Sequence, residues 1–337
     1  MTMPPKLASV PAFPSVALKL LSLLADGKSS FSSIAECIAT DPALSGKLIK
    51  RANAADQLRY CEARNIQQAV GALGIDRTRE ISLATATSSF AGSAIKTEIL
   101  RPCWHHTVAC ALAASEVARQ WGLPPAEPYT AGLLHDIGRL GLLAAYPAEY
   151  ENLMAGADGQ PEDLIGAERE CFGVDHVEAG LWLARQWNLP ESIVEAIGRH
   201  HETPSGKLDE VTVVQIACRL ADLLGFSVNR PGKPPELEEI TSALPAWMGQ
   251  RLSAQLPALK AAIDEEIWLF HSSDVPPEES PEESVEDREP EPGPVACDFH
   301  DEVSPAAISL PHLRPAIIAA IFAAAVLVLS GVLFFPR

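Results

Sequence analysis

The sequence predicts an all-α protein: a helical N-terminal lobe packed on a second helical core, with a C-terminal transmembrane helix. No segment shows the sustained period-two alternation of a half-buried strand, so no substantial sheet is expected. The stretches between turns are rich in Ala and Leu, which are good helix formers. With 47% hydrophobic residues, the 337-residue chain can bury a sizeable core and is long enough for two domains.

The first elements are short amphipathic helices. Leu18, Leu21 and Leu24 recur at helical spacing. Asp41 and Pro42 mark the start of a further helix, because Asp is a favoured N-cap and Pro is favoured at the first helical position.

Gly74 is predicted to close one helix before Asp76 opens the next. This arrangement is compatible with a DNA-binding helix-turn-helix. However, the segment carries only Arg77 and Arg79 as positive charges in an acidic protein, which disfavours that interpretation.

The second core is expected from about residue 99 to residue 226. Within it, the segment from Tyr129 to Tyr146 is predicted to form one helix. Residues 231–270 begin with Pro-Gly-Lys-Pro-Pro and then return to a helical pattern, which closes the globular part.

The net charge of −18 is concentrated in one segment, because residues 274–302 carry twelve acidic residues and one arginine. Residues 274–312 are rich in Pro, Glu and Ser and cannot bury enough apolar surface to fold, so we interpret them as a disordered linker. The acidic balance argues against broad nucleic-acid contact, which needs clustered Lys and Arg, so no nucleic-acid partner is expected.

The twenty residues from Ala316 to Phe335 contain no charge, and about 20 apolar residues span a bilayer as a helix. A buried core helix is the alternative, but a core helix usually shows a polar stripe. Arg314 and Arg337 flank the segment almost symmetrically, so their charges do not predict on which side of the membrane the globular part lies. That prediction is based instead on the lack of an export signal at the N-terminus. We therefore expect a single-pass C-terminal anchor with the globular part on the cytoplasmic face of the bacterial inner membrane.

The predicted organisation thus has five parts, as follows: residues 1–98, N-terminal helical lobe; 99–230, second helical core; 231–273, C-terminal helical extension; 274–312, acidic linker; 313–337, membrane anchor. Seven cysteines are scattered without a C-x-x-C pair. They are interpreted as reduced core thiols, so neither a disulfide framework nor a zinc finger is expected.

A ladder of histidines and aspartates runs through the second core. Six of the nine histidines fall between positions 105 and 201, in the order His105-His106, His135-Asp136, His176 and His200-His201. Imidazole and carboxylate together suit divalent transition metals. An HD pair in an apolar segment with further His on both sides is typical of a metal-dependent phosphohydrolase core.

The ladder and its surroundings resemble the HDOD family, the HD-related output domain of bacterial signalling proteins. The resemblance covers roughly residues 7–230. It rests on five segments of this chain: VPAFP at 10–14, DPAL at 41–44, AVGALGIDRTR at 69–79, WHHT at 104–107 and AGLLHDIGRL at 131–140. The family implies an all-helical fold, here with an HD-type core at residues 99–230, and a role in signal output, without a settled catalytic activity.

The resemblance also implies a ligand set for a divalent metal, with Mn, Fe, Zn or Mg as the candidates and one or two ions. The matching positions are His106, His135, Asp136, His176, His200, His201 and Asp222. Asp136 and Arg139 are the candidate catalytic residues if the site is active, and a two-metal site would activate water for attack on phosphorus. The alternative is a metal-free domain in which His135 and Asp136 form a hydrogen-bonded core pair.

Three departures disfavour a cyclic-dinucleotide phosphodiesterase. That subfamily has Lys where this chain has Arg139, and the two cations differ in geometry. The subfamily also has a Gly-Tyr-Pro signature after its His-His-Glu, whereas this chain continues from His200-His201-Glu202 with Thr-Pro-Ser-Gly. Finally, Pro102 stands where the subfamily adds a Glu. We therefore expect a membrane-tethered regulator that binds signalling proteins through its N-terminal lobe, and a metal-dependent phosphohydrolase as the alternative.

Overall fold

The computed structural model describes residues 3–25, 30–54, 62–92, 94–156, 163–207, 209–228, 235–242 and 244–272. Every regular element in these ranges is a helix, which confirms the all-α prediction. The predicted linker and the predicted membrane span at residues 316–335 lie outside the described residues. Within the described ranges, none of the helices combines the length and apolar character needed to cross a bilayer.

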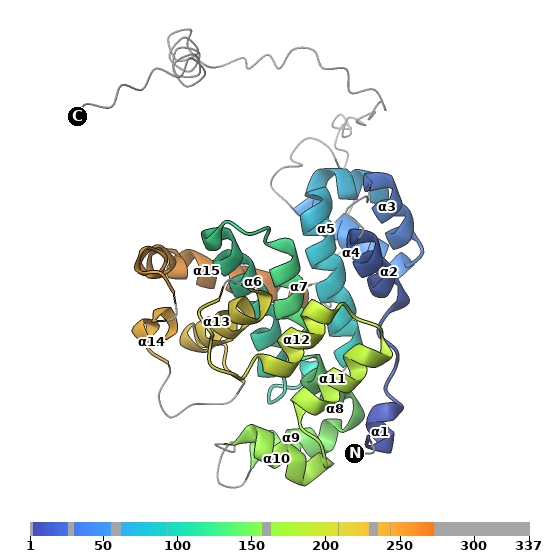
Figure 1. Ribbon diagram of the computed structural model, residues 1–337. Helices are drawn as coiled ribbons and strands as arrows, with labels where there is room; N and C mark the ends of the chain where they lie inside the picture. The colour runs from blue at the N-terminus through green and yellow to red at the C-terminus, as the bar shows by residue number, and fades with distance from the viewer. Residues whose placement is uncertain are drawn as a thin grey trace, which may run out of the picture. The chain divides into compact units, whose positions relative to one another are not determined.

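The N-terminal helices are α1 Pro5–Ala8, α2 Ser15–Ala25, α3 Phe31–Ala39, α4 Pro42–Ala54 and α5 Ile66–Ala91. Helices α2, α3 and α4 and the start of α5 form a lobe at one end of the globular part, whereas α1 lies away from that lobe, against the helix Ile137–Ala145 (Figure 1). Asp41 caps α4 as predicted, since its Oδ1 accepts hydrogen bonds from the backbone N–H groups of Ala43 and Leu44, each at 3.0 Å.

A kink at Gly74 divides α5, as the sequence predicts. Gly74 has φ 78° and ψ 167°, a conformation that costs glycine little and interrupts the helix. The first half of α5 packs with α2, α3 and α4 around a small core of its own, which includes Leu20, Ile34 and Leu48. The second half belongs to the main core through Leu83 and Phe90.

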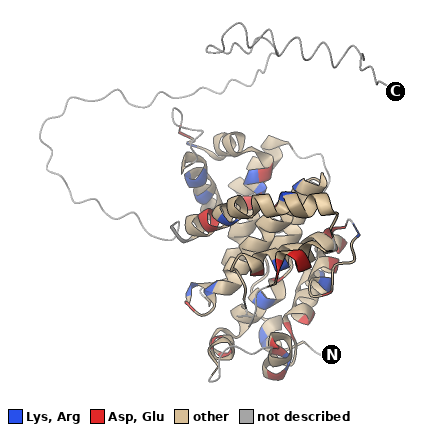
Figure 2. Ribbon diagram, turned by 90° about the vertical axis from the view of Figure 1, so that its left-hand side faces the viewer, with Lys and Arg blue, Asp and Glu red and all other residues tan. Residues whose placement is uncertain are grey.

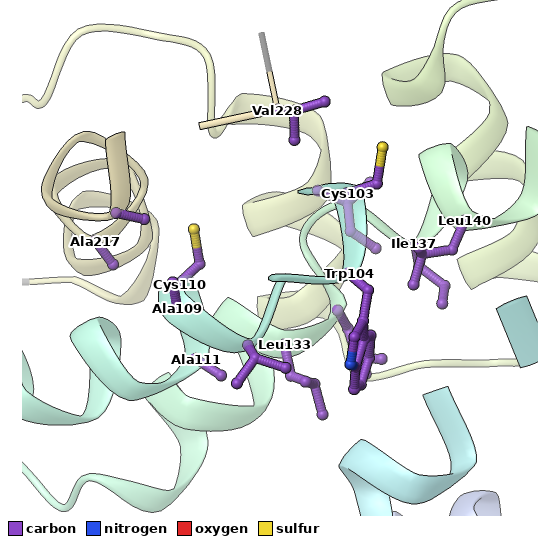
Figure 3. Close-up of a cluster of buried hydrophobic side chains, with 14 of the residues drawn as sticks. Cys103, Trp104, Ala109, Cys110, Ala111, Leu133, Ile137, Leu140, Ala217 and Val228 are labelled. Carbon is purple, nitrogen blue, oxygen red and sulfur yellow. The ribbon is translucent and has the colours of Figure 1, made fainter. Parts of the chain in front are cut away.

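The remaining helices follow from residue 94 onward, and several of them pack along α6. They are η2 Ala94–Lys96, α6 Arg101–Trp121, α7 Ala126–Leu134, α8 Ile137–Ala145, α9 Pro147–Ala155, α10 Leu164–Phe172, α11 His176–Gln186, α12 Glu191–Arg199, α13 Glu210–Leu223, α14 Leu237–Thr241 and α15 Ala246–Ser272. Helices α7 and α13 pack along α6, and α11 packs on α8. Figure 3 shows part of the main core, in which Trp104, Cys110 and Leu133 are buried between these helices.

The segment from Tyr129 to Tyr146 is not one helix, so that prediction is wrong. Helix α7 ends at Leu134 and α8 starts at Ile137, with His135 and Asp136 between them. Asp136 has φ −104° and ψ 21°, outside the helical region. The apolar pattern continues through the break because both helices are buried on most of their surface, so periodicity alone could not reveal it.

The C-terminal helix α15 is tied to the lobe by a buried ion pair network. Glu266 on α15 bonds to Arg51 on α4 and to Arg77 on α5. The Glu266 side chain is only 4% exposed. This network connects α15, the last described helix, to α4 and to α5.

Candidate metal centre

The HD pair lies in a short turn that two glycines position. A Cβ on Gly132 would lie 2.7 Å from the Cys110 carbonyl oxygen, and one on Gly138 would lie 1.9 Å from the His176 carbonyl oxygen. Helices α7 and α8 can therefore approach α6 and α11 only because these positions lack a side chain. This close approach brings His135 and Asp136 beside the histidines of the other helices.

The ladder residues gather around one cavity of about 380 Å³. Six of the seven predicted ligands line it, and they are His106, Asp136, His176, His200, His201 and Asp222. The seventh, His135, lies directly behind, with its ring centroid 4.9 Å from that of His200. We call this space the histidine cavity.

Four histidines present the same ring nitrogen to the histidine cavity. Nδ1 of each faces an acceptor from the surrounding protein: Phe226 O for His106 at 2.8 Å, Gly132 O for His135 at 2.6 Å, Glu168 Oε2 for His176 at 2.6 Å, and Ile197 O for His200 at 2.8 Å. An N–H at Nδ1 leaves Nε2 with its lone pair free to coordinate.

Three buried polar atoms at the centre have no hydrogen-bond partner among the described residues. They are His135 Nε2, Asp136 Oδ1 and His200 Nε2. The three lie within 4.8 Å of one another, and His200 Nε2 is 3.8 Å from Asp136 Oδ1. Buried polar atoms are rarely left unpaired, and this donor set suits a divalent cation, so the residues fit the metal that the ladder implies.

A second group of ring nitrogens extends the set. Nε2 of His176 lies 2.7 Å from Nε2 of His201 and 3.6 Å from Asp136 Oδ1. Asp222 is more peripheral, since its Oδ1 lies 3.7 Å from His106 Nδ1, on the side of that ring that faces away from the ligand nitrogen.

Arg139 is fully engaged with the protein. Its Nε donates to Asp136 Oδ2 at 2.7 Å, one terminal nitrogen contacts Glu168 Oε1 and the Tyr150 hydroxyl, each at 3.0 Å, and the other faces His176 Nε2 at 3.2 Å. The Arg139 side chain is 5% exposed. Its hydrogen bonds orient Asp136 so that Oδ1 points into the histidine cavity.

Charge and burial tune these groups in opposite directions. Burial alone would raise the pKa of the Asp136 carboxyl, but the Arg139 guanidinium and the imidazoles of His176, His135 and His200 together outweigh it and hold this pKa well below its usual range. Burial, together with neighbouring imidazoles, keeps the pKa of His200 well below its usual value. His201 lines the cavity but is exposed, and partial desolvation together with the nearby His176 imidazole lowers its pKa to about 4. At neutral pH the carboxylate is therefore ionised and these two imidazoles are neutral, which is the form that ligates metals.

Sequence reasoning missed two cysteines in this site. The ring nitrogens of His106 and His135 and the sulfurs of Cys110 and Cys218 all lie within 4.8 Å of one another. The spacing contained a signal, because Cys110 follows His106 by four residues and Cys218 precedes Asp222 by four, which places each pair on one helix face.

The two thiols differ in acidity and affect His135. The hydrogen bond from Cys110 lowers the pKa of the Cys218 thiol well below its usual range, whereas burial raises the pKa of Cys110 well above it. Burial would lower the pKa of His135, but the charge and hydrogen bond of Cys218, the Asp136 carboxylate and the Gly132 carbonyl together outweigh it and raise that pKa to about 9, so a metal ion that binds Nε2 must displace a proton.

Glu168 and Tyr150 were also missed. They come from α10 and α9, are fully buried, and are bonded to each other and to Arg139. A single glutamate or tyrosine in an amphipathic helix carries no sequence signal for such a role.

Comparison with known proteins identifies the same family that the motifs suggest. Residues 10–203 match the model of the HDOD domain. Among solved structures, an HDOD domain protein of unknown function from Geobacter sulfurreducens has a TM-score of 0.61 at 24% identity, covering 76% of this chain and 93% of its own. A candidate signal transduction protein from Marinobacter aquaeolei VT8 has a TM-score of 0.64 at 16% identity, covering 78% of this chain and 60% of its own.

Curated relatives are matched over part of their length. Ribonuclease Y from Thermus thermophilus is 30% identical over 158 residues, which is 47% of this chain. The chain spans 21% of that relative and 39% of an uncharacterized protein from Treponema pallidum, so the match concerns one region of much longer proteins.

Proposed function

The chain belongs to the HDOD domain family, and from that premise we propose that it is a signal-output protein that acts through contacts with other signalling proteins. In this proposal the N-terminal lobe binds the partner, the histidine cavity holds a divalent metal, and residues 316–335 tether the protein to the cytoplasmic face of the bacterial inner membrane.

The observation that favours a regulatory protein over an enzyme concerns the arginines of the histidine cavity. Arg139 and Arg219 are the cations among its described lining residues. The Arg139 guanidinium forms hydrogen bonds with the side chains of Asp136, Glu168, Tyr150 and His176. Arg219 donates to the backbone carbonyls of Gln215 and Glu202. Phosphoryl transfer depends on positive groups that clamp the transferred phosphate. Here both arginines are already bonded to the protein, which favours a regulatory role.

The N-terminal lobe is the proposed contact surface. Its helices α2 and α3 pack on each other, on α4 and on α5, and Phe31 at the start of α3 is 52% exposed. On the side of the globular part that carries α13, α14 and α15, which faces the viewer in Figure 2, basic and acidic residues are interspersed, so that side does not resemble the clustered basic surface of a nucleic-acid binder.

A metal-dependent phosphohydrolase is the second candidate. It is supported by the metal-ligand set of the histidine cavity and by the similarity to Ribonuclease Y. A bound divalent ion would supply Lewis acidity toward a phosphoryl oxygen. The protein's own contribution would be an Asp136 carboxylate that Arg139 keeps oriented, and neutral imidazoles on His200 and His201 that would help to hold the ion.

Two measurements on the full chain separate the candidates. In the first, the purified protein is assayed with manganese against cyclic and linear dinucleotides. In the second, a photo-crosslinking amino acid is placed at position 31. Position 247 is the control, because Trp247 is similarly exposed on α15. We expect a crosslinked partner at position 31 alone and no turnover near 1 per second. Turnover at that rate with no crosslink at position 31 would reverse the ranking.

The membrane tether is tested separately by fractionation. The full chain should sediment with membranes after a high-salt wash, and a chain that ends at residue 272 should remain in the supernatant. A full chain found wholly in the supernatant would remove the tether from the proposal without affecting the other two parts.

A further inference from the structure

The sulfurs of Cys110 and Cys218 change what the histidine cavity can bind. Both cysteines are free thiols, Cys110 fully buried and Cys218 partly so at the cavity wall. Cys110 lies on α6 and Cys218 on α13, two helices that pack side by side, as the neighbouring labels Cys110 and Ala217 show in Figure 3. His106 and His135 complete a group of four ligand atoms that lie within 4.8 Å of one another.

We propose that His106, Cys110, His135 and Cys218 form a tetrahedral site for zinc or a similarly thiophilic divalent ion. This N2S2 site is distinct from the carboxylate side of the histidine cavity, where Asp136 lies with His176, His200 and His201. The inference goes beyond the proposed function, because a sulfur-bound ion neither requires nor excludes partner binding by the lobe.

The distances suit a tetrahedral ion. Zn–N bonds near 2.0 Å and Zn–S bonds near 2.3 Å place neighbouring ligand atoms about 3.4 to 3.8 Å apart. His106 Nε2 lies 3.4 Å from Cys110 Sγ. The remaining separations extend to at most 4.8 Å, so closure around an ion requires side-chain movements on the order of 1 Å.

The surrounding protein already holds the two imidazoles in the ligating orientation. His106 Nδ1 bonds to Phe226 O and His135 Nδ1 bonds to Gly132 O. The Nε2 atom of His135 is buried and has no hydrogen-bond partner among the described residues. Such outer hydrogen bonds fix the tautomer and the ring plane of metal-ligating histidines.

The choice of ion follows from the sulfurs. Thiolates select zinc and other thiophilic ions over magnesium, calcium and manganese, which prefer oxygen. His135 Nε2 also lies near Asp136 and His200, but one nitrogen lone pair binds one ion. With His135 assigned to the sulfur side, Asp136 and the three other histidines still provide one carboxylate and three imidazoles for a second ion.

The test is X-ray absorption at the zinc edge on the full chain, expressed with zinc and purified in reductant without chelator. We expect a zinc–sulfur shell near 2.3 Å with two sulfurs around a tightly bound ion. A shell of nitrogen and oxygen alone, or a Cys110–Cys218 disulfide in place of the ion, would overturn the proposal. This spectrum needs no variant, so it remains decisive if a substitution prevents folding.

Variants then assign the sulfurs. The double variant C110S/C218S should lose one equivalent of zinc and the sulfur shell, whereas Cys103→Ser, a buried thiol on the same helix outside the group, should keep both. Asp136→Asn should keep the sulfur shell, because it alters only the carboxylate side. Equal zinc content in the double variant and the wild type would contradict the assignment. None of these readouts depends on partner binding or turnover, so their failure is distinguishable from failure of the proposed function.

Discussion

Glu168 holds His176 at two points: its Oε2 accepts hydrogen bonds from the His176 backbone N–H at 2.9 Å and from the ring Nδ1 at 2.6 Å. The same carboxylate bonds through Oε1 to Arg139 and Tyr150. Glu168 therefore fixes the ring that faces Asp136 and also the guanidinium that orients Asp136.

The first prediction concerns this positioning role. Glu168→Gln should weaken metal binding at the carboxylate side of the histidine cavity by about 10 to 100-fold, the usual effect of losing an outer partner of a ligating histidine. Competition titration of the full chain against a chelator measures it. Glu170→Gln, an exposed change two residues along the same helix, is the matched control. Equal affinities in the two variants would show that Glu168 does not position the ligand.

The second prediction concerns the close contact of α8 with α11. Gly138→Ala should destabilise the fold by about 3 kcal/mol or more, because its Cβ would lie 1.9 Å from the His176 carbonyl oxygen and 2.3 Å from the Gly180 nitrogen. Denaturant unfolding measures the loss. Gly71→Ala, in an exposed helical position with nothing within 4 Å, should instead stabilise by roughly 0.5 to 1 kcal/mol. Similar effects from the two substitutions would contradict the packing described for Gly138.

The third prediction concerns the network between α15 and the lobe. Glu266→Gln should cost about 3 kcal/mol, because it leaves the Arg51 guanidinium buried without its countercharge. Glu265→Gln, at the exposed neighbouring position, should be close to neutral. Urea unfolding followed by circular dichroism compares them. A Glu266 variant as stable as the Glu265 variant would mean that the helix is held by its apolar contacts alone.

The fourth prediction concerns pH in the metal-free chain. The pKa of His201 is about 4 in the folded protein against an ordinary value of 6.5, so protonation favours the unfolded state. Its contribution to stability is complete above about pH 6.5 and is lost as the pH falls toward 4. After chelator treatment, the unfolding free energy of His201→Asn should therefore fall less steeply across this window than that of the wild type. Parallel curves would contradict the shifted pKa.

The sequence alone determined the fold class and the family, and it predicted most of the residues that line the histidine cavity. Helix signals that act within a few residues, such as the Asp41 cap and the Gly74 break, were readable because their physics is local. The order of His106, His135-Asp136, His176 and His200-His201 was readable because the spacing of metal-type ligands carries a recognisable pattern.

Tertiary structure alone decided which other groups join these residues. Glu168 and Tyr150 resemble any polar residues of amphipathic helices until α9 and α10 fold against Arg139. Cys110 and Cys218 lie 108 positions apart in the sequence, and only the packing of α6 against α13 brings their sulfurs to the same two histidines. The break at the HD pair has the same origin: burial on all sides erases the periodicity that would reveal it, and the close contacts at Gly132 and Gly138 fix the turn that gives His135 and Asp136 a common centre.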